Sequence, residues 1–227
     1  VFERLPMTLI HLYPELDGTF PNHPADPIDP ANRRDLDREV RERRADIGLA
    51  FDGDADRVFL VDERAEGVSG SEVTALIAAA MLERHPGASV VYNLICSWTV
   101  PEVILEHGGR PIRTRVGHSF IKQVMAETGA VFGGEHSGHY YFRDNFRADS
   151  GSIAALVVLE QIFRAGVPLS MLRKPFDRHA ASGEINWITA IAMTAFHIGA
   201  VAAFFYIDLG AIISMFVLWW VAGSLGI

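Results

Sequence analysis

The chain has 227 residues, of which 49% are hydrophobic and 21% are charged, as in an ordinary folded globular protein. Its formal net charge of -8 argues against the strongly basic surface that binds nucleic-acid phosphates, so we expect no nucleic-acid partner. A single cysteine, Cys96, excludes an internal disulfide and fits a reducing compartment.

The order of the predicted elements indicates the fold class. Prolines at positions 6, 14, 21, 24, 27 and 30 predict turns and extended chain at the start. Hydrophobic periodicity then predicts helices at residues 31–44, from residue 71 onward, and at 100–107, 119–127 and 152–165. Short apolar runs predict strands at 47–51, 58–61, 89–94, near 112, 130–132 and 140–142. Because strands alternate with helices, we expect an α/β fold.

The C-terminal stretch differs in composition from the rest. Every Lys and Arg lies at or before Arg178, and an uncharged run at 187–207 has about the ~20 residues that a membrane-spanning helix needs. A second apolar stretch covers 211–227. We therefore expect an apolar α-helical hairpin at 184–227, inserted in a membrane through residues 187–227. A buried helix of a soluble protein is the alternative.

Basic residues place the rest of the chain relative to that membrane. Arg173, Lys174 and Arg178 precede the first apolar run, and no basic residue separates the two runs. Because basic residues favour the cytoplasmic side, we expect residues 1–180 to lie in the cytoplasm.

An acidic loop follows the first predicted strand. Asp52, Asp54 and Asp56 are spaced by two, and in extended chain this spacing directs side chains to one side. Three carboxylates suit a hard divalent cation such as Mg²⁺. Gly53 would permit the tight turn, and the guanidinium of Arg57 suits bidentate contact with a phosphate beside the metal.

Two other interpretations of this loop remain. The three aspartates and Glu63 occupy positions one, three, five and twelve of an EF-hand calcium loop, but Arg57 stands where that loop needs glycine, and the flanks are strand-like. An ordinary solvated acidic turn is the other alternative. We favour magnesium.

A second loop carries residues suited to a sugar. Glu135, Ser137 and His139 alternate after the strand predicted at 130–132. A carboxylate accepts hydrogen bonds and a hydroxyl can donate or accept, which suits neighbouring sugar hydroxyls. Upstream, His118 carries an imidazole, a group that can take up or release a proton and so could assist proton transfer.

Four segments in order resemble motifs of the alpha-phosphohexomutases, the phosphomannomutase/phosphoglucomutase family. Residues 51–57 are similar to the family's magnesium loop, and residues 133–139 to its Gly-Glu-x-Ser-Gly-His sugar loop. Residues 17–24 resemble its Asp-Gly-x-Phe-Pro-x-His signature, and residues 117–122 its Gly-His-Ser segment.

The resemblance implies two mixed-sheet α/β domains of phosphohexomutase type: a metal-binding domain at 1–66, the second of the family, and a sugar-binding domain at 67–178, the third. It implies that Mg²⁺ is the cofactor and that the partner is a hexose phosphate, mannose or glucose 1- or 6-phosphate. The implied roles are metal binding by Asp52, Asp54 and Asp56, catalysis by Arg57 and His118, and substrate binding by Glu135, Ser137 and His139.

The resemblance is incomplete. The sequence contains no Thr-Ala-Ser-His-Asn-Pro type of loop, which carries the family's phosphoserine, nor the family's fourth domain, and Trp98 stands where a basic residue is expected. The family moves phosphate between the six and one positions of a hexose through a bisphosphate. Because that transfer needs an in-line donor, we expect a truncated mutase that does not catalyse alone.

The tail resembles a different family. Residues 186–200 and 217–227 look like the first membrane hairpin of a fatty acid (acyl-CoA) desaturase, without its iron-binding histidine boxes. We therefore expect a mutase fragment joined to a desaturase fragment. The alternatives are a membrane-tethered module that binds Mg²⁺ and sugar phosphate, and a fragment of a membrane desaturase.

Overall fold

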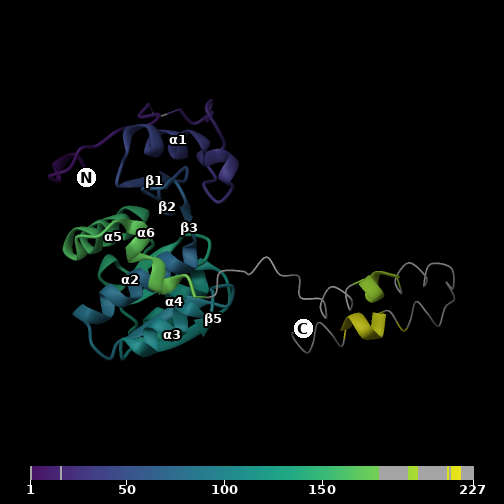
Figure 1. Ribbon diagram of the computed structural model, residues 1–227. Helices are drawn as coiled ribbons and strands as arrows, with labels where there is room; N and C mark the ends of the chain where they lie inside the picture. The colour runs from purple at the N-terminus through teal and green to yellow at the C-terminus, as the bar shows by residue number, and fades with distance from the viewer. Residues whose placement is uncertain (1, 16, 179–193, 199–213, 215, 221–227) are drawn as a thin grey trace. The chain divides into compact units, whose positions relative to one another are not determined.

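The computed structural model describes residues 2–15, 17–178, 194–198, 214 and 216–220 (Figure 1). The chain divides into two compact units, Val1–Ala180 and Ala181–Ile227. In the second unit, residues 194–198 and 216–220 are helical and exposed. The rest of the hairpin expected at 184–227 lies outside the described residues.

A small antiparallel sheet follows the proline-rich start. Two short 3-10 helices, η1 (Phe2–Arg4) and η2 (Pro30–Arg33), precede helix α1 (Arg34–Arg43). The strands β1 (Ile47–Phe51), β2 (Val58–Asp62) and β3 (Gly67–Val68) then pair in the order β1-β2-β3. Helix α1 packs through Leu36 and Val40 onto this sheet, where Gly48 leaves room: a Cβ there would lie 2.9 Å from Val40.

A second, mixed sheet has the strand order β5-β4-β6-β7. Strand β4 runs parallel to β5 and β6, whereas β7 is antiparallel to β6. Its strands are β4 (Ser89–Asn93), β5 (Arg110–Thr114), β6 (Phe132–Gly134) and β7 (Tyr140–Phe142). The accompanying helices are α2 (Gly70–Arg84), α3 (Thr99–Glu106), α4 (His118–Thr128), η3 (Arg143–Asn145), α5 (Gly151–Ala165), α6 (Leu169–Leu172) and η4 (Lys174–Phe176).

Helix α2 is the centre of the core. Its residues from Gly70 to Leu82 are all buried, and apolar side chains surround it, as expected for a helix enclosed by other elements. A capping box fixes its start: the Ser69 hydroxyl accepts from the Glu72 amide, and the Glu72 carboxylate accepts from the Ser69 amide.

The structure confirms the expected mixed α/β architecture and the type of nearly every predicted element. The strand predicted at 130–132 is displaced to Phe132–Gly134. Val131 already donates to Ser89, but the ladder with β4 continues through Gly133 and Gly134, which an apolar pattern does not include. The short elements β3 and α6 were not predicted.

Within the described residues, no single helix combines the length and apolar composition of a membrane span. Helix α5 and residues 169–176 are long and apolar enough only when taken together, and the chain bends by 91° between them.

One arginine joins the small sheet to helix α2. Arg173 donates from Nε to Asp62 at 3.1 Å, from Nη1 to Glu72 at 3.0 Å and from Nη2 to Glu66 at 2.9 Å. Its side chain is 14% exposed and that of Asp62 is fully buried. Asp62 ends β2 and Glu72 lies in the first turn of α2, so a single guanidinium holds the small sheet against the core helix.

Replacing this arginine is expected to destabilise the protein. Arg173→Met leaves the buried Asp62 carboxylate without its cation, a type of change that costs about 3–5 kcal/mol. Urea unfolding measures the loss. Arg164→Met is the matched control, because Arg164 pairs with Glu83 at the surface and its loss costs below about 1 kcal/mol. Equal losses of stability from the two substitutions would contradict the role of Arg173 in holding the small sheet against α2.

Candidate functional site

Backbone pairing brings the two candidate loops together. The loop at 52–57 joins β1 to β2, and the loop at 135–139 joins β6 to β7. Arg57 forms an antiparallel bridge with His139, and the Val58 amide donates to the Gly138 carbonyl at 3.3 Å. The acidic loop of one sheet therefore lies directly against the polar loop of the other.

The three aspartates converge as expected. Asp52, Asp54 and Asp56 each offer one carboxylate oxygen, and these oxygens all lie within 4.8 Å of one another. The reason differs from the prediction, because this segment is a turn and not extended chain: Ala55 adopts a left-handed conformation, with φ 60°, and donates to the Asp52 carbonyl. Gly53 instead leaves room for the ring of Phe20, 3.2 Å from the position of a Cβ.

The aspartates have different electrostatic environments. Asp52 accepts from the Arg57 amide at 3.1 Å and from its Nε at 2.6 Å. Burial raises the pKa of Asp52, but the hydrogen bonds from Arg57 outweigh it and lower this pKa overall. The pKa of Asp56 is raised, first by burial and then by Asp52 and other carboxylates, against the opposing effect of His139.

The EF-hand interpretation is wrong. Strands β1 and β2 flank the loop, in place of the two helices that an EF-hand requires. Glu63, the expected twelfth ligand, accepts instead from the amide of Ser170 at 3.1 Å and from its hydroxyl.

The second loop is a connected polar cluster. The Ser137 hydroxyl donates to Glu135 at 2.8 Å and lies 3.1 Å from Nδ1 of His139. Burial raises the pKa of Glu135, but contacts with His139 and Ser137 and the Gly117 amide lower it overall, so the carboxylate is held in its charged form. Gly138 closes the turn with φ 88°, where a Cβ would lie 2.6 Å from Phe59.

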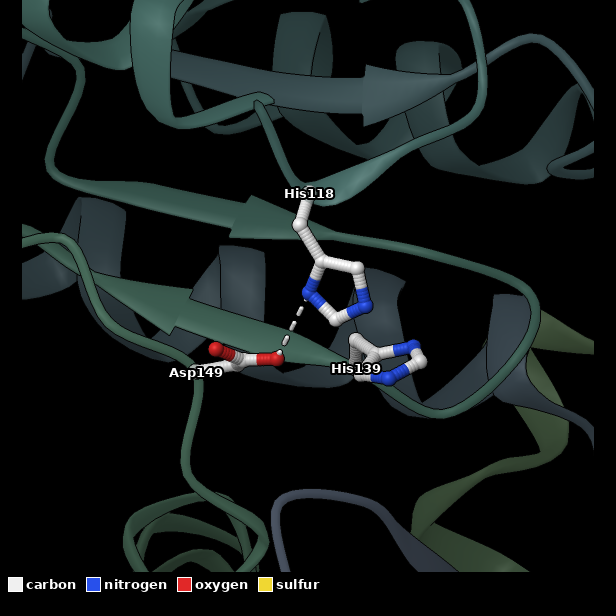
Figure 2. Close-up of side chains that lie close together, drawn as sticks. All are labelled: His118, His139 and Asp149. Carbon is white, nitrogen blue, oxygen red and sulfur yellow. Dashed lines mark ion pairs between the residues drawn. The ribbon is translucent and has the colours of Figure 1, made fainter. Parts of the chain in front are cut away.

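His118 comes to the same place from another element. It is the first residue of α4, and its ring centroid lies 4.4 Å from that of His139. Figure 2 shows the two imidazoles beside Asp149, whose Oδ2 lies 3.1 Å from Nδ1 of His118. The Tyr141 hydroxyl is 3.0 Å from the same nitrogen.

Sequence reasoning missed two members of this cluster. Asp149 directly precedes Ser150, the N-cap of α5, and Tyr141 lies within a short apolar strand. Neither position has a sequence signal that separates it from an ordinary helix start or a core aromatic.

Trp98, where a basic residue was expected, is 66% exposed.

Models of two domains of one protein family match the chain. "Phosphoglucomutase/phosphomannomutase, alpha/beta/alpha domain II" matches residues 1–67, and "alpha/beta/alpha domain III" of the same family matches residues 69–179.

Curated relatives and a solved structure agree with these matches. A phosphomannomutase of Escherichia coli is 40% identical over 185 residues, covering 80% of this chain and 40% of the relative. One of Methanocaldococcus jannaschii is 40% identical over 178 residues, covering 78% and 39%. A phosphoglucomutase/phosphomannomutase family protein from Burkholderia thailandensis superimposes with a TM-score of 0.69 at 35% identity, covering 72% of this chain and 36% of that one.

The matches are confined to one part of the family's architecture. The chain spans about 40% of the length of the curated relatives it matches. The matched residues include both the acidic loop and the polar loop that meets it. The chain thus belongs to the phosphoglucomutase/phosphomannomutase family, of which it carries domains II and III.

Proposed function

We propose that residues 1–178 bind Mg²⁺ and a hexose phosphate, as the metal-binding and sugar-binding half of a phosphohexomutase. The observation that carries the proposal is the pairing of Arg57 with His139, which sets the acidic loop against the polar loop. The domain boundaries at 1–66 and 67–178 are part of this proposal, as is a cytoplasmic location for residues 1–180.

The acidic loop fits a hard cation. Oδ1 of Asp56 is buried without a hydrogen-bond partner, an arrangement that an ion or a water would satisfy. Burial, and after it the neighbouring carboxylates, raise the pKa of Asp56, and a positive charge among these carboxylates would relieve their repulsion. Asp52, Asp54 and Asp56 would hold Mg²⁺, which supplies charge neutralisation for a bound phosphate when present.

The polar loop fits a sugar. Glu135 is 2% exposed and remains charged, so it can accept hydrogen bonds from adjacent hydroxyls of a hexose. Ser137 and His139 border the same carboxylate. Mannose and glucose phosphates both present such hydroxyls, and we propose the class of hexose phosphates without choosing between them.

The parent reaction would exchange phosphate between the six and one positions of the sugar through a bisphosphate. Arg57 would lie beside the transferred group, and His118 would hold or move a proton at the sugar hydroxyl. Because transfer needs a phosphoserine donor in line with the acceptor, we expect turnover only when a segment with that serine is supplied together with this chain.

The tail adds a separate hypothesis. Attachment to a membrane through 187–227, and the likeness of 184–227 to a desaturase hairpin, depend mainly on residues outside those that the structure describes. Both stay predictions from the sequence.

Magnesium binding tests the acidic loop. Asp54→Asn removes one carboxylate charge from an exposed position and should weaken Mg²⁺ binding by at least about 10-fold, measured by isothermal titration. Asp46→Asn, at an exposed position before β1, is the control and should bind as the unaltered chain does. A chain that binds no Mg²⁺, or an Asp54→Asn variant with full affinity, would contradict the metal assignment.

The affinity for Mg²⁺ should also depend on pH. Protons compete with the metal for a carboxylate, and the raised pKa of Asp56 means that this competition begins at a higher pH than for an ordinary aspartate. The affinity should therefore fall as the pH is lowered, starting above the usual titration range of aspartate. Titrations across the acidic range would measure it, and a constant affinity would argue against Asp56 as a ligand.

Sugar-phosphate binding tests the polar loop. Glu135→Gln removes the charged acceptor and its contact with His139, and the loss of a charged hydrogen bond, about 1.5–3 kcal/mol, corresponds to about 10- to 100-fold weaker binding. Titration with mannose 6-phosphate and glucose 1-phosphate in excess Mg²⁺ measures it. Glu127→Gln, exposed on α4, is the control. Equal affinities of the two variants would exclude Glu135 from the binding site.

A further inference from the structure

We propose that His118, His139 and Asp149 form a second metal site, which takes a transition-metal ion such as Zn²⁺. It is distinct from the aspartate loop in its ligand atoms, and the proposal does not depend on the proposed function. Figure 2 shows the three side chains close together, with His118 and Asp149 directed toward each other. They come from the start of α4, the β6–β7 loop and the segment before α5.

The distances suit a common ion. One ligand atom from each of the three side chains lies within 4.8 Å of the other two. Nδ1 of His118 and Oδ2 of Asp149 are 3.1 Å apart. Two ligands about 2.1 Å from a tetrahedral Zn²⁺ lie about 3.4 Å apart, so this pair already has nearly the spacing of two adjacent corners.

Asp149 provides an independent observation. Its side chain is 8% exposed, and Oδ2 is buried without a hydrogen bond, although Nδ1 of His118 is near. Oδ1 pairs with Lys122 at 3.2 Å. A buried carboxylate oxygen that faces an imidazole and has no hydrogen-bond partner is an arrangement that a bound ion explains.

The surroundings of His139 resemble the outer shell of a zinc site. Its Nδ1 lies 3.1 Å from the Ser137 hydroxyl and 3.6 Å from Glu135. A histidine that binds a metal typically donates its other ring N–H to a carboxylate or a similar acceptor. With Nδ1 directed to Glu135 and Ser137, Nε2 is left for a metal.

Neighbouring groups both favour and oppose a cation. Asp56 lies 3.6 Å from Nε2 of His139 and adds negative charge, as Glu135 does on the other side. Lys122 opposes a cation, and a metal at Nδ1 of His118 must replace the contact with the Tyr141 hydroxyl. The carboxylates outnumber the single ammonium group, so the balance of charge favours the metal.

The ligand types separate the two sites. Imidazole nitrogen suits Zn²⁺, Cu²⁺ and similar ions, whereas a set of carboxylates alone suits Mg²⁺. Three protein ligands would leave a fourth position for water or a phosphate oxygen. Bound Zn²⁺ would also withdraw both imidazoles from a hexose phosphate, and this consequence alone rests on the proposed function.

A zinc titration in saturating Mg²⁺ tests the proposal, because Mg²⁺ occupies carboxylate sites. The 227-residue chain should bind one Zn²⁺, measured by isothermal titration. His118→Gln and Asp149→Asn should each weaken it by more than about 100-fold, because the loss of even an outer-shell partner costs about 10- to 100-fold. The controls are His85→Gln, at the end of α2, and Asp54→Asn, and both should retain Zn²⁺ binding.

Cobalt gives a second readout. Co²⁺ in place of Zn²⁺ should produce visible absorption bands typical of a tetrahedral nitrogen and oxygen site, and His139→Gln should abolish them. Circular dichroism melts establish that each variant is folded, and His118, about half exposed, is the substitution least able to disturb the core. Undiminished Zn²⁺ binding in His118→Gln would overturn the site, as would loss of Zn²⁺ binding in Asp54→Asn alone.

Discussion

The backbone pairing between the two loops is the constraint on which the site depends. Arg57 pairs with His139, and the Val58 amide donates to Gly138, so two loops from different sheets share main-chain hydrogen bonds. Buried main-chain N–H and C=O groups need hydrogen-bond partners. Moving either loop away from the other would leave such groups unpaired, so this pairing holds the two loops in place. Arg57 is both the end of the acidic loop and part of this bridge, so movement of either loop would also displace the guanidinium that holds Asp52.

Small residues make this close approach possible. A Cβ at Gly70 would lie 2.1 Å from the His136 carbonyl oxygen, and one at Gly151 would lie 2.7 Å from that of Arg57. The first residues of α2 and α5 thus lie directly against the backbone of the two loops. A side chain at Gly70 or Gly151 would force the backbone to move. The position of the loops therefore depends on helix α2, and Arg173 in turn connects α2 to the small sheet.

Features that depend on local hydrophobic pattern or on the order of motifs could be predicted from the sequence. The alternation of elements and the choice of Asp52, Asp54 and Asp56 both followed from it, although the convergence of the aspartates arises from a left-handed Ala55 and not from extended chain or Gly53. Asp149 could not be predicted, because its proximity to His118 is set by the pairing of β6 with β7 and by the bridge from Tyr141 to Asp149. Such contacts depend on which strands pair in the folded chain, and the spacing of residues along the sequence does not predict them.

The distribution of charge bears on the order in which the proposed metal ion and the proposed phosphate would bind. Asp52, Asp56 and Asp149 are buried or partly buried within one small region, and the guanidinium of Arg57 is already engaged by Asp52. A phosphate entering such a region would meet carboxylates more often than free cationic groups. Coulomb repulsion is strong where water is largely excluded, so the carboxylates must first be neutralised. Under the proposed function, a metal ion among the aspartates would convert a region that repels phosphate into one that attracts it. Metal binding is then expected to precede phosphate binding.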